Sequence, residues 1–198
     1  PSQRCGTLSA DVTDPDQAAN AIDQLIQKIG VPDLVINSAG VAHPGRFYEL
    51  DLKSFHWMMN VNYFGIVNVL KAVVPSMINR GSGHIVNMSS SAGFIGVYGY
   101  SAYGASKYAV RGFSDVLRAE LKPLGIKVSI VFPPDTETPQ LAYEDQFKPA
   151  ETKALSGNVS PMSAEDVART ILRGVERGKY VILPGSDNKL LFKLTGLL

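Results

Sequence analysis

The sequence lacks the features that mark several classes of protein. Its 198 residues contain one cysteine, Cys5, so an internal disulfide is excluded and a reducing compartment is favoured. Nineteen Lys and Arg stand against 18 Asp and Glu, and a net charge of +1 is too balanced for a basic nucleic-acid-binding protein. The N-terminus has no positively charged segment followed by an apolar stretch, as a signal peptide would. The nearest candidate for a membrane span, residues 190–198, is shorter than the ~18 residues that a span needs. We therefore expect neither a signal peptide nor a span.

Apolar residues, by contrast, make up 45% of the chain, which is enough for the core of one domain over residues 1–198. Short apolar runs alternate with segments of helical period, a pattern typical of βαβ units. Strands are predicted at 6–10, 34–36, 84–88, 127–132 and 180–183, and helices at 15–29, 54–78, 101–121 and from about 164. Because the strand runs are continuously apolar, the sheet should be parallel and covered on both faces. We expect an α/β fold with a doubly wound, Rossmann-like parallel sheet in three αβα layers.

The two long helices should each bury one apolar face. Pro75 should bend or end the first of them. The predicted buried positions of the first helix are Phe55, Met58, Val61, Ile66, Val69 and Val73. Those of the second are Ala102, Ala105, Ala109, Phe113, Val116, Leu117 and Leu121.

Polar and glycine-rich clusters follow three of the predicted strands, at residues 37–40, 89–93 and 133–136. Ligands of an open parallel sheet bind outside the carboxyl ends of its strands, so these clusters predict the position of the functional site. The least regular stretch, residues 133–161, is long for a connection in a compact domain. We interpret it as a substrate lid within the single domain.

Tyr103 and Lys107 are four residues apart on the second long helix and therefore share a face. A tyrosine with the ordinary pKa of about 10 is almost fully protonated at neutral pH, and a nearby ammonium group lowers that pKa. A tyrosine tuned in this way can give or take a proton at a carbonyl or alcohol oxygen. A serine hydroxyl at the neighbouring strand end could hydrogen-bond the same oxygen.

With these residues in place, the chain resembles the short-chain dehydrogenase/reductase family. That family carries Tyr-x-x-x-Lys with a serine thirteen residues before the tyrosine, and Ser90 stands thirteen residues before Tyr103. The other motifs that match are the run Asn37-Ser38-Ala39-Gly40, Asn62 on the first long helix, the pair Asp11-Val12, and Thr138. They occur in the family's order over nearly the whole chain.

The resemblance implies a role for each matched residue. Tyr103 would give a proton to a developing alkoxide, Lys107 would lower the pKa of Tyr103 and hold the nicotinamide ribose, and Ser90 would bind the carbonyl oxygen. Asn62 would support a water relay to Lys107. The implied cofactor-binding residues are Asp11, Val12, Asn37, Ala39, Gly40, Tyr103, Lys107, Pro133, Thr136 and Thr138.

Two departures from the family pattern stand out. The glycine-rich phosphate turn, Thr-Gly-x-x-x-Gly-x-Gly, has no match, and we expect it to precede Pro1 with the rest of a first βαβ unit of about 50 residues. The run Pro-Pro-Asp-Thr-Glu-Thr-Pro at 133–139 stands where most members have Pro-Gly. This run is similar to the branch of the family that reduces 3-ketodihydrosphingosine (3-dehydrosphinganine), as are Lys148-Pro149 and Gly185-Ser186-Asp187.

Membership of that branch implies NADPH as the cofactor and the 3-keto group of a long-chain sphingoid base as the substrate. It implies a location on the cytosolic side of the endoplasmic reticulum in a eukaryote. Relatives commonly form dimers and tetramers through the two long helices, so a homo-oligomer is expected. Residues 190–198 could contact a membrane surface or a partner. No nucleic-acid partner is expected.

Several alternatives stay open at this point. Leu141, Tyr143 and Phe147 could form an apolar lid over a lipid tail, or they could be ordinary packing. The chain could act on a steroid, retinoid or 3-oxoacyl substrate, or it could be a catalytically silent, cofactor-sensing or scaffold member of the family. No metal site is expected, because the three histidines show no metal-ligand spacing: His43, His56 and His84.

Overall fold

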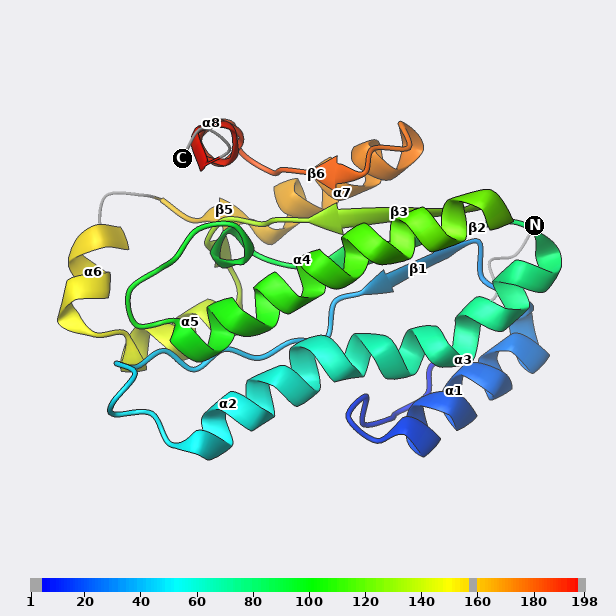
Figure 1. Cartoon of the computed structure of the whole chain (residues 1–198), viewed down its shortest axis with the longest axis horizontal. Coiled ribbons are helices and arrows are strands. Elements are labelled where there is room, and N and C mark those ends of the chain that lie inside the picture. The colour runs from blue at the N-terminus through cyan, green and yellow to red at the C-terminus, as the bar shows by residue number, and fades with distance from the viewer. Residues whose placement is uncertain (1–4, 157–159, 196–198) are drawn as a thin grey trace.

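The computed structural model describes residues 5–156 and 160–195. Four strands in this part of the chain form a parallel sheet in the order β1-β2-β3-β6 (Figure 1). The strands are β1 (Leu34–Asn37), β2 (Gly83–Met88), β3 (Ile126–Val131) and β6 (Val181–Ile182). The two central strands, β2 and β3, are buried over most of their length. The predicted parallel sheet, covered on both faces, is therefore confirmed.

The sheet separates two groups of helices. Side chains alternate between the faces of a strand, so the neighbours Ile85 and Val86 point in opposite directions, and they belong to different core clusters. The cluster on one face joins the sheet to α1 (Pro15–Ile29), α3 (Gly65–Arg80) and α4 (Ser101–Leu121). The other joins it to α7 (Ala164–Glu176). This is the expected three-layer αβα arrangement.

The helix starts follow the capping residues in the sequence. Asp14 accepts hydrogen bonds from the backbone of Asp16 and Gln17 at the start of α1. The Ser163 Oγ accepts one from the Asp166 backbone at the start of α7, at 3.1 Å. Both interactions satisfy amide groups that the first turn of a helix leaves free.

The first long helix contains a wide turn that the sequence pattern did not reveal. It consists of α2 (Leu52–Met59), a π-helical turn at Asn60–Phe64 and α3. The extra residue of a π-turn shifts the buried face, so Val61 and Val69 are only partly buried, while Leu70 and Met77 are almost wholly so. The expected end of the helix at Pro75 is not found, since α3 continues to Arg80, and the alternative, a bend there, stays a prediction.

The buried face of α4 also differs from the prediction. Ala105 and Val116 are exposed, whereas Ser106 and Ser114 are completely buried. Each serine donates its hydroxyl to a carbonyl of its own helix: Ser106 to Tyr103 at 2.7 Å and Ser114 to Val110 at 2.7 Å. An apolar-stripe argument counts serine as a surface residue and therefore misses this face.

Two further predictions are corrected. Residues 6–10 form no strand, because β1 is the outermost strand of the described sheet and no strand pairs with them. The segment 133–161, predicted to be irregular, contains α5 (Pro139–Phe147), α6 (Ala150–Ser156) and β4 (Thr136–Glu137). β4 pairs in parallel with β5 (Met162–Ser163). Residues 157–159 lie outside the described part.

The segment Leu52–Arg80 is, among the described residues, a stretch long and apolar enough to cross a membrane, with a mean hydropathy of 1.4. The expectation that no window reaches this limit is therefore wrong by length and composition. A helix that packs in a protein core passes the same test, and Leu70, Val73 and Met77 of this segment lie in the core.

The last element is α8 (Ser186–Thr195), which returns to the sheet. Its Phe192 ring lies 5.0 Å from the Phe94 ring and 5.6 Å from that of Phe132. Leu190 and Leu194 are exposed on the same helix. The predicted contact of residues 190–198 with a membrane or partner stays a prediction, and residues 196–198 lie outside the described part.

The turn that joins α4 to β3 depends on Gly125. Its φ is +80°, and a Cβ there would collide with the Gly81 carbonyl oxygen. We expect Gly125→Ala to lower the free energy of unfolding by about 2 kcal/mol or more. Gly112→Ala, in the exposed interior of α4 with open space around it, should raise that free energy by about 0.5–1 kcal/mol. Urea unfolding of both variants measures this, and equal effects would contradict it.

Candidate active site

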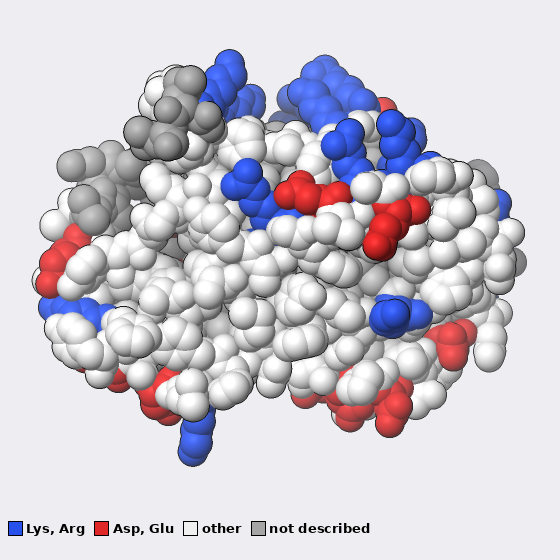
Figure 2. Space-filling view, in the orientation of Figure 1, with Lys and Arg blue, Asp and Glu red and all other residues white. Residues whose placement is uncertain are grey.

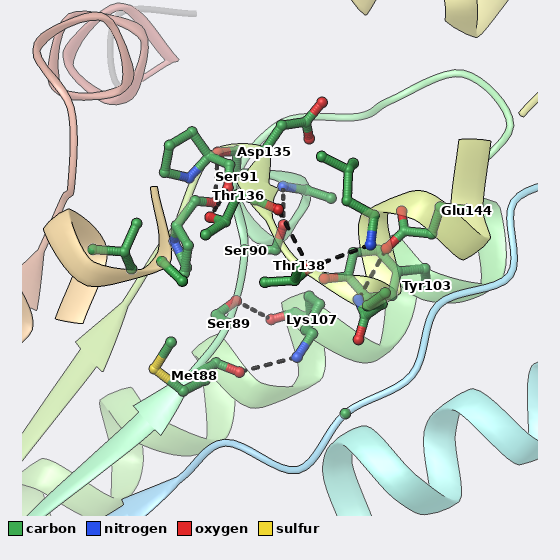
Figure 3. A pocket seen from close by; sticks show the side chains of 18 of the residues that line it. Met88, Ser89, Ser90, Ser91, Tyr103, Lys107, Asp135, Thr136, Thr138 and Glu144 are labelled. Carbon is green, nitrogen blue, oxygen red and sulfur yellow. Dashed lines mark hydrogen bonds between the residues drawn. The ribbon is translucent and has the colours of Figure 1, made fainter. Parts of the chain in front are cut away.

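A cavity of about 520 Å³ opens at the carboxyl ends of β1, β2 and β3 (Figure 3). Residues from all three predicted polar clusters line it, among them Gly40, Ser90 and Pro133. Residues of α4, α5 and α7 complete the wall. The geometry therefore confirms that the three strand ends line one cavity, and its use as the functional site stays a prediction.

Ser90, Tyr103 and Lys107 meet in this cavity (Figure 3). The Ser90 and Tyr103 side chains are hydrogen-bonded, and the Ser90 Oγ also accepts from the Ala92 backbone at 3.2 Å. The Lys107 Nζ lies 5.5 Å from the centre of the Tyr103 ring and donates to the Met88 carbonyl at 3.0 Å. The three residues come from the end of β2 and the first turns of α4.

Burial dominates the electrostatics of these groups. It raises the pKa of Tyr103 above its usual value, against the Ser90 hydrogen bond, which lowers it, and with the charges of Glu144 and Asp135, which raise it further. Burial also lowers the pKa of Lys107 to about 8. The predicted lowering of the Tyr103 pKa by Lys107 is therefore not found, because burial raises that pKa instead. Tyr103 is held as the neutral phenol, a proton donor.

Asn62 lies in the π-turn and is completely buried. Its Oδ1 accepts from the Val41 backbone at 2.8 Å, and its Nδ2 donates to the Val41 carbonyl at 2.9 Å and to the Ser106 Oγ at 2.9 Å. Asn62 thus holds the loop after β1 against α4. Both amide hydrogens are used in these contacts, so the implied water relay stays a prediction.

Gly40 lies between Asn62 and Lys107. A Cβ at this position would be 3.3 Å from the Asn62 Oδ1 and 3.5 Å from the Lys107 Nζ. The absence of a side chain keeps the space in front of the ammonium open, as a ribose hydroxyl would require. The matched residues around Gly40 and Lys107 therefore fit the nicotinamide ribose that the family resemblance implies.

Asn37 does not line the cavity but belongs to a buried hydrogen-bonded chain beneath its wall. Its Nδ2 donates to the Asn87 Oδ1 at 2.9 Å, and the Asn87 Nδ2 donates to the Ser114 Oγ at 3.0 Å. This buried chain joins β1, β2 and α4. Asn87 and Ser114 were missed from the sequence, and Ala39, an implied cofactor contact, does not line the cavity.

The loop after β3 is fixed by hydrogen bonds to the loop after β2. The Ser91 backbone and hydroxyl both donate to the Pro133 carbonyl at 3.0 Å, and the hydroxyl also lies 3.0 Å from the Asn188 Oδ1. Pro133, Thr136 and Thr138 line the cavity, and the cofactor contacts implied for them stay a prediction. The Thr138 Oγ1 also caps α5 by accepting from the Leu141 backbone at 3.2 Å.

Asp11 and Val12 lie away from the cavity lining. The Asp11 carboxylate accepts from the Thr13 backbone at 2.9 Å, and the Val12 carbonyl accepts from the Asn68 Nδ2 at 2.9 Å. These contacts shape the turn before α1 and tie it to α3. The adenine contact implied for the pair stays a prediction.

The three predicted lid residues of α5 have different surroundings. Leu141 lines the cavity, but Tyr143 and Phe147 do not. Their rings pack on His43, with the Tyr143 hydroxyl 3.0 Å from the His43 Nδ1. The structure thus shows Tyr143 and Phe147 packed on His43 and outside the cavity lining, and a contact of these two residues with a substrate stays a prediction.

Glu144, on the cavity side of α5, was missed from the sequence. It lines the cavity together with Tyr100, Gln140 and Lys148. Acidic residues in a helix usually face solvent, so the neighbours Glu144 and Asp145 give no sequence signal that one of them is buried. In the described part of the chain, no group of three or more His, Cys, Asp or Glu side chains could hold a metal ion.

Comparison with known proteins gives a family and several relatives. The family model described as short chain dehydrogenase matches residues 2–148. A 3-ketodihydrosphingosine reductase from Dictyostelium discoideum is 44% identical over 186 residues, which cover 92% of this chain and 56% of that protein. A protein of the same name from Mus musculus is 40% identical over 189 residues, covering 95% of this chain and 57% of that protein. The chain thus spans little more than half the length of these relatives.

The solved structure of ElxO with NADP bound is similar to this chain, with a TM-score of 0.77 and 28% sequence identity. The match covers 88% of this chain and 74% of that one. The similarity supports the Rossmann-like α/β architecture seen in the sheet order.

Buried Lys107 should make the stability of the protein depend on pH. Its pKa is about 8 in the folded protein, against an ordinary 10.5, so the unfolded state binds more protons between these values. Relative to Lys107→Met, the free energy of unfolding of the native protein should therefore rise by up to about 3 kcal/mol between pH 8 and pH 10.5. Below pH 8 the difference should be constant. Urea unfolding at a series of pH values measures it, with exposed Lys71→Met as the control, and a flat or falling difference would contradict it.

Proposed function

The chain belongs to the short chain dehydrogenase family, and from this premise we propose that it reduces the 3-keto group of 3-ketodihydrosphingosine with NADPH. The observation that carries the proposal is the meeting of Ser90, Tyr103 and Lys107 in one cavity at the strand ends. Two relatives at 44% and 40% identity bear the name of this activity and support the substrate. The similarity to ElxO with NADP bound supports the cofactor.

The proposed reaction converts a ketone to a secondary alcohol by adding one hydride and one proton. Gly40 and Lys107 would hold the nicotinamide half of the cofactor, which would supply the hydride for the carbonyl carbon. The Ser90 hydroxyl donates a hydrogen bond to the carbonyl oxygen, and the Tyr103 phenol gives its proton to that oxygen as negative charge develops there. Because burial keeps Tyr103 protonated, the proton is in place before the charge appears.

Lys107 has two functions in this proposal. Its ammonium faces the open space beside Gly40, where it can hold the ribose hydroxyls of the nicotinamide half. With a pKa of about 8, it can also return a proton toward Tyr103 after each turnover. Asn62 fixes the loop that carries Gly40 and so keeps this space open.

The proposal includes the location and the assembly of the protein. A long-chain ketone partitions into membranes, so we place the protein at the cytosolic face of the endoplasmic reticulum, in contact with the lipid surface. Charged side chains are sparse over α2 and the first half of α4 (Figure 2). Trp57 of α2, Phe64 of the π-turn, Tyr108 of the first half of α4 and Val116 of its second half are exposed. We assign this apolar face to a homo-oligomer contact.

The Tyr103→Phe variant should test the reaction most directly. Loss of the phenol removes the proton donor, and general acids typically contribute about 10²–10⁴-fold to a rate. We expect turnover of 3-ketodihydrosphingosine by the full-length protein to fall by at least about 100-fold, while NADPH still binds. Tyr48→Phe, at an exposed tyrosine outside both the cavity lining and the assigned oligomer face, is the matched control. Near-normal turnover in Tyr103→Phe would contradict the assignment of Tyr103 as the proton donor. Turnover of steroid, retinoid and 3-oxoacyl ketones by the native protein tests the proposed substrate.

The oligomer contact has its own test. Val116→Glu places a charge in the exposed apolar face of α4 without touching the cavity, and should shift the protein toward monomer in analytical ultracentrifugation. Leu124→Glu, an equally apolar exposed position outside the two helices, is the control. A protein whose assembly is unchanged by Val116→Glu does not use this face.

A further inference from the structure

Glu144 is an acidic residue inside the candidate active site that the proposed reaction does not use. It lies on α5 with 8% of its surface exposed, and it lines the same cavity as Tyr103. Figure 3 shows the two side chains next to each other in the cavity wall. A carboxylate is rarely buried without a role or a compensating partner.

The partners of Glu144 are neutral. The Tyr100 hydroxyl donates to its Oε2 at 2.7 Å, and the Gln140 Nε2 donates to its Oε1 at 2.9 Å. A carboxylate offers about four lone-pair positions, so about two of them remain for another donor. Among the ion pairs of the described residues, none includes Glu144, and the nearby Lys148 pairs with Asp145 at 2.7 Å instead.

A second carboxylate increases the negative charge of this wall. Asp135 also lines the cavity, and its Oδ2 lies 3.9 Å from the Lys148 Nζ. Lys148 is thus paired with Asp145 and Asp135, and it acts on Glu144 only from a greater distance. Burial raises the pKa of Glu144, and a bound cation would favour its charged form. Lys107, the other lysine of the lining, donates to the Met88 carbonyl. The α5 side of the cavity therefore suits a cationic ligand group.

The negative charge lies close to the proton donor. The Tyr100 ring, whose hydroxyl is bonded to Glu144, has its centre 5.7 Å from that of the Tyr103 ring. The charges of Glu144 and Asp135 both act on Tyr103. A cation held by Glu144 would therefore lie on the same side of the cavity as the proton donor.

We propose that Glu144 recognises a primary ammonium group on the carbon next to the ketone, and so selects 2-amino ketones over ketones without an amine. The inference rests on the proposed function for the position of the ketone. The ammonium donates to the unfilled lone pairs of Glu144 and neutralises a buried charge. A ketone without the amine, or with the amine acylated, leaves that charge unpaired and binds less well. Glu144 is thus a specificity-determining residue rather than a catalytic one.

A structural role is the competing explanation. In that case Glu144 would only hold α5 against Tyr100 through their hydrogen bond, and we call this contact the clasp. The two roles make different predictions, because the clasp depends on the bond and recognition depends on the charge. Glu144→Gln keeps the size of the side chain and an oxygen that can accept from Tyr100, but removes the charge. Tyr100→Phe removes the bond and keeps the charge.

The experiment measures kcat/KM of the full-length protein for 3-ketodihydrosphingosine and for the same ketone lacking the amino group. Glu144→Gln should lower the ratio of the two values by about 10- to 100-fold, mainly through the amino ketone. Tyr100→Phe should keep most of that ratio. Glu137→Gln, an exposed carboxylate of β4 outside the cavity lining, is the matched control and should leave the ratio unchanged. An unchanged ratio in Glu144→Gln, or an equal loss in Tyr100→Phe, overturns the proposal.

A binding measurement separates this inference from the proposed function. Dihydrosphingosine, the amine-bearing product, and its N-acetyl derivative are titrated by calorimetry against the native protein and Glu144→Gln. Recognition of the ammonium predicts that Glu144→Gln weakens binding of the free amine about tenfold or more and spares the N-acetyl form. If neither ketone is reduced but this difference is found, the function fails and the recognition stands. If both ketones are reduced and the difference is absent, the recognition fails and the function stands.

Discussion

The site depends on one constraint of parallel sheets: the strands end at the same edge, and the polar groups gathered there are buried together. They must satisfy one another, and among the described residues no buried side-chain nitrogen or oxygen lacks a hydrogen-bond partner. Asn37, Asn87 and Ser114 join two strand ends to α4, while Asn62 ties Val41 to the same helix. The positions of Tyr103 and Lys107 on α4 follow from these contacts.

The sequence was sufficient where a local rule determines the structure. Asp14 and Ser163 start helices where capping rules place them, and the spacing of Ser90, Tyr103 and Lys107 predicted their meeting. It was insufficient where packing decides. The π-turn around Asn62 carries no composition signal. The direction in which α5 turns Leu141, Tyr143 and Glu144 depends on neighbours remote in the chain.

The electrostatics of the site likewise show what local spacing can predict and what depends on packing. Proximity of Lys107 to Tyr103 suggested an acidic phenol, but the buried environment acts more strongly on both groups and shifts their pKa values toward the neutral forms. Burial depends on the whole fold, so spacing alone could not give the direction. The result is a neutral donor next to a base of moderate strength, which suits delivery of a proton to an oxygen that becomes charged only during the reaction.

The short pairing of β4 with β5 has a consequence for how the protein can change. The chain leaves the sheet region through Thr136–Glu137 and returns beside it through Met162–Ser163, so both ends of the helical segment between them are held at one point. A segment whose two ends are held together can gain or lose residues at little entropic cost. Doubling its length raises the free energy of loop closure by only about 0.6 kcal/mol. The segment that contains Glu144 can therefore be remodelled as a module while the strand-end chemistry stays intact. The strand ends that carry Ser90 and the helical segment that carries Glu144 are therefore structurally separable parts of the chain.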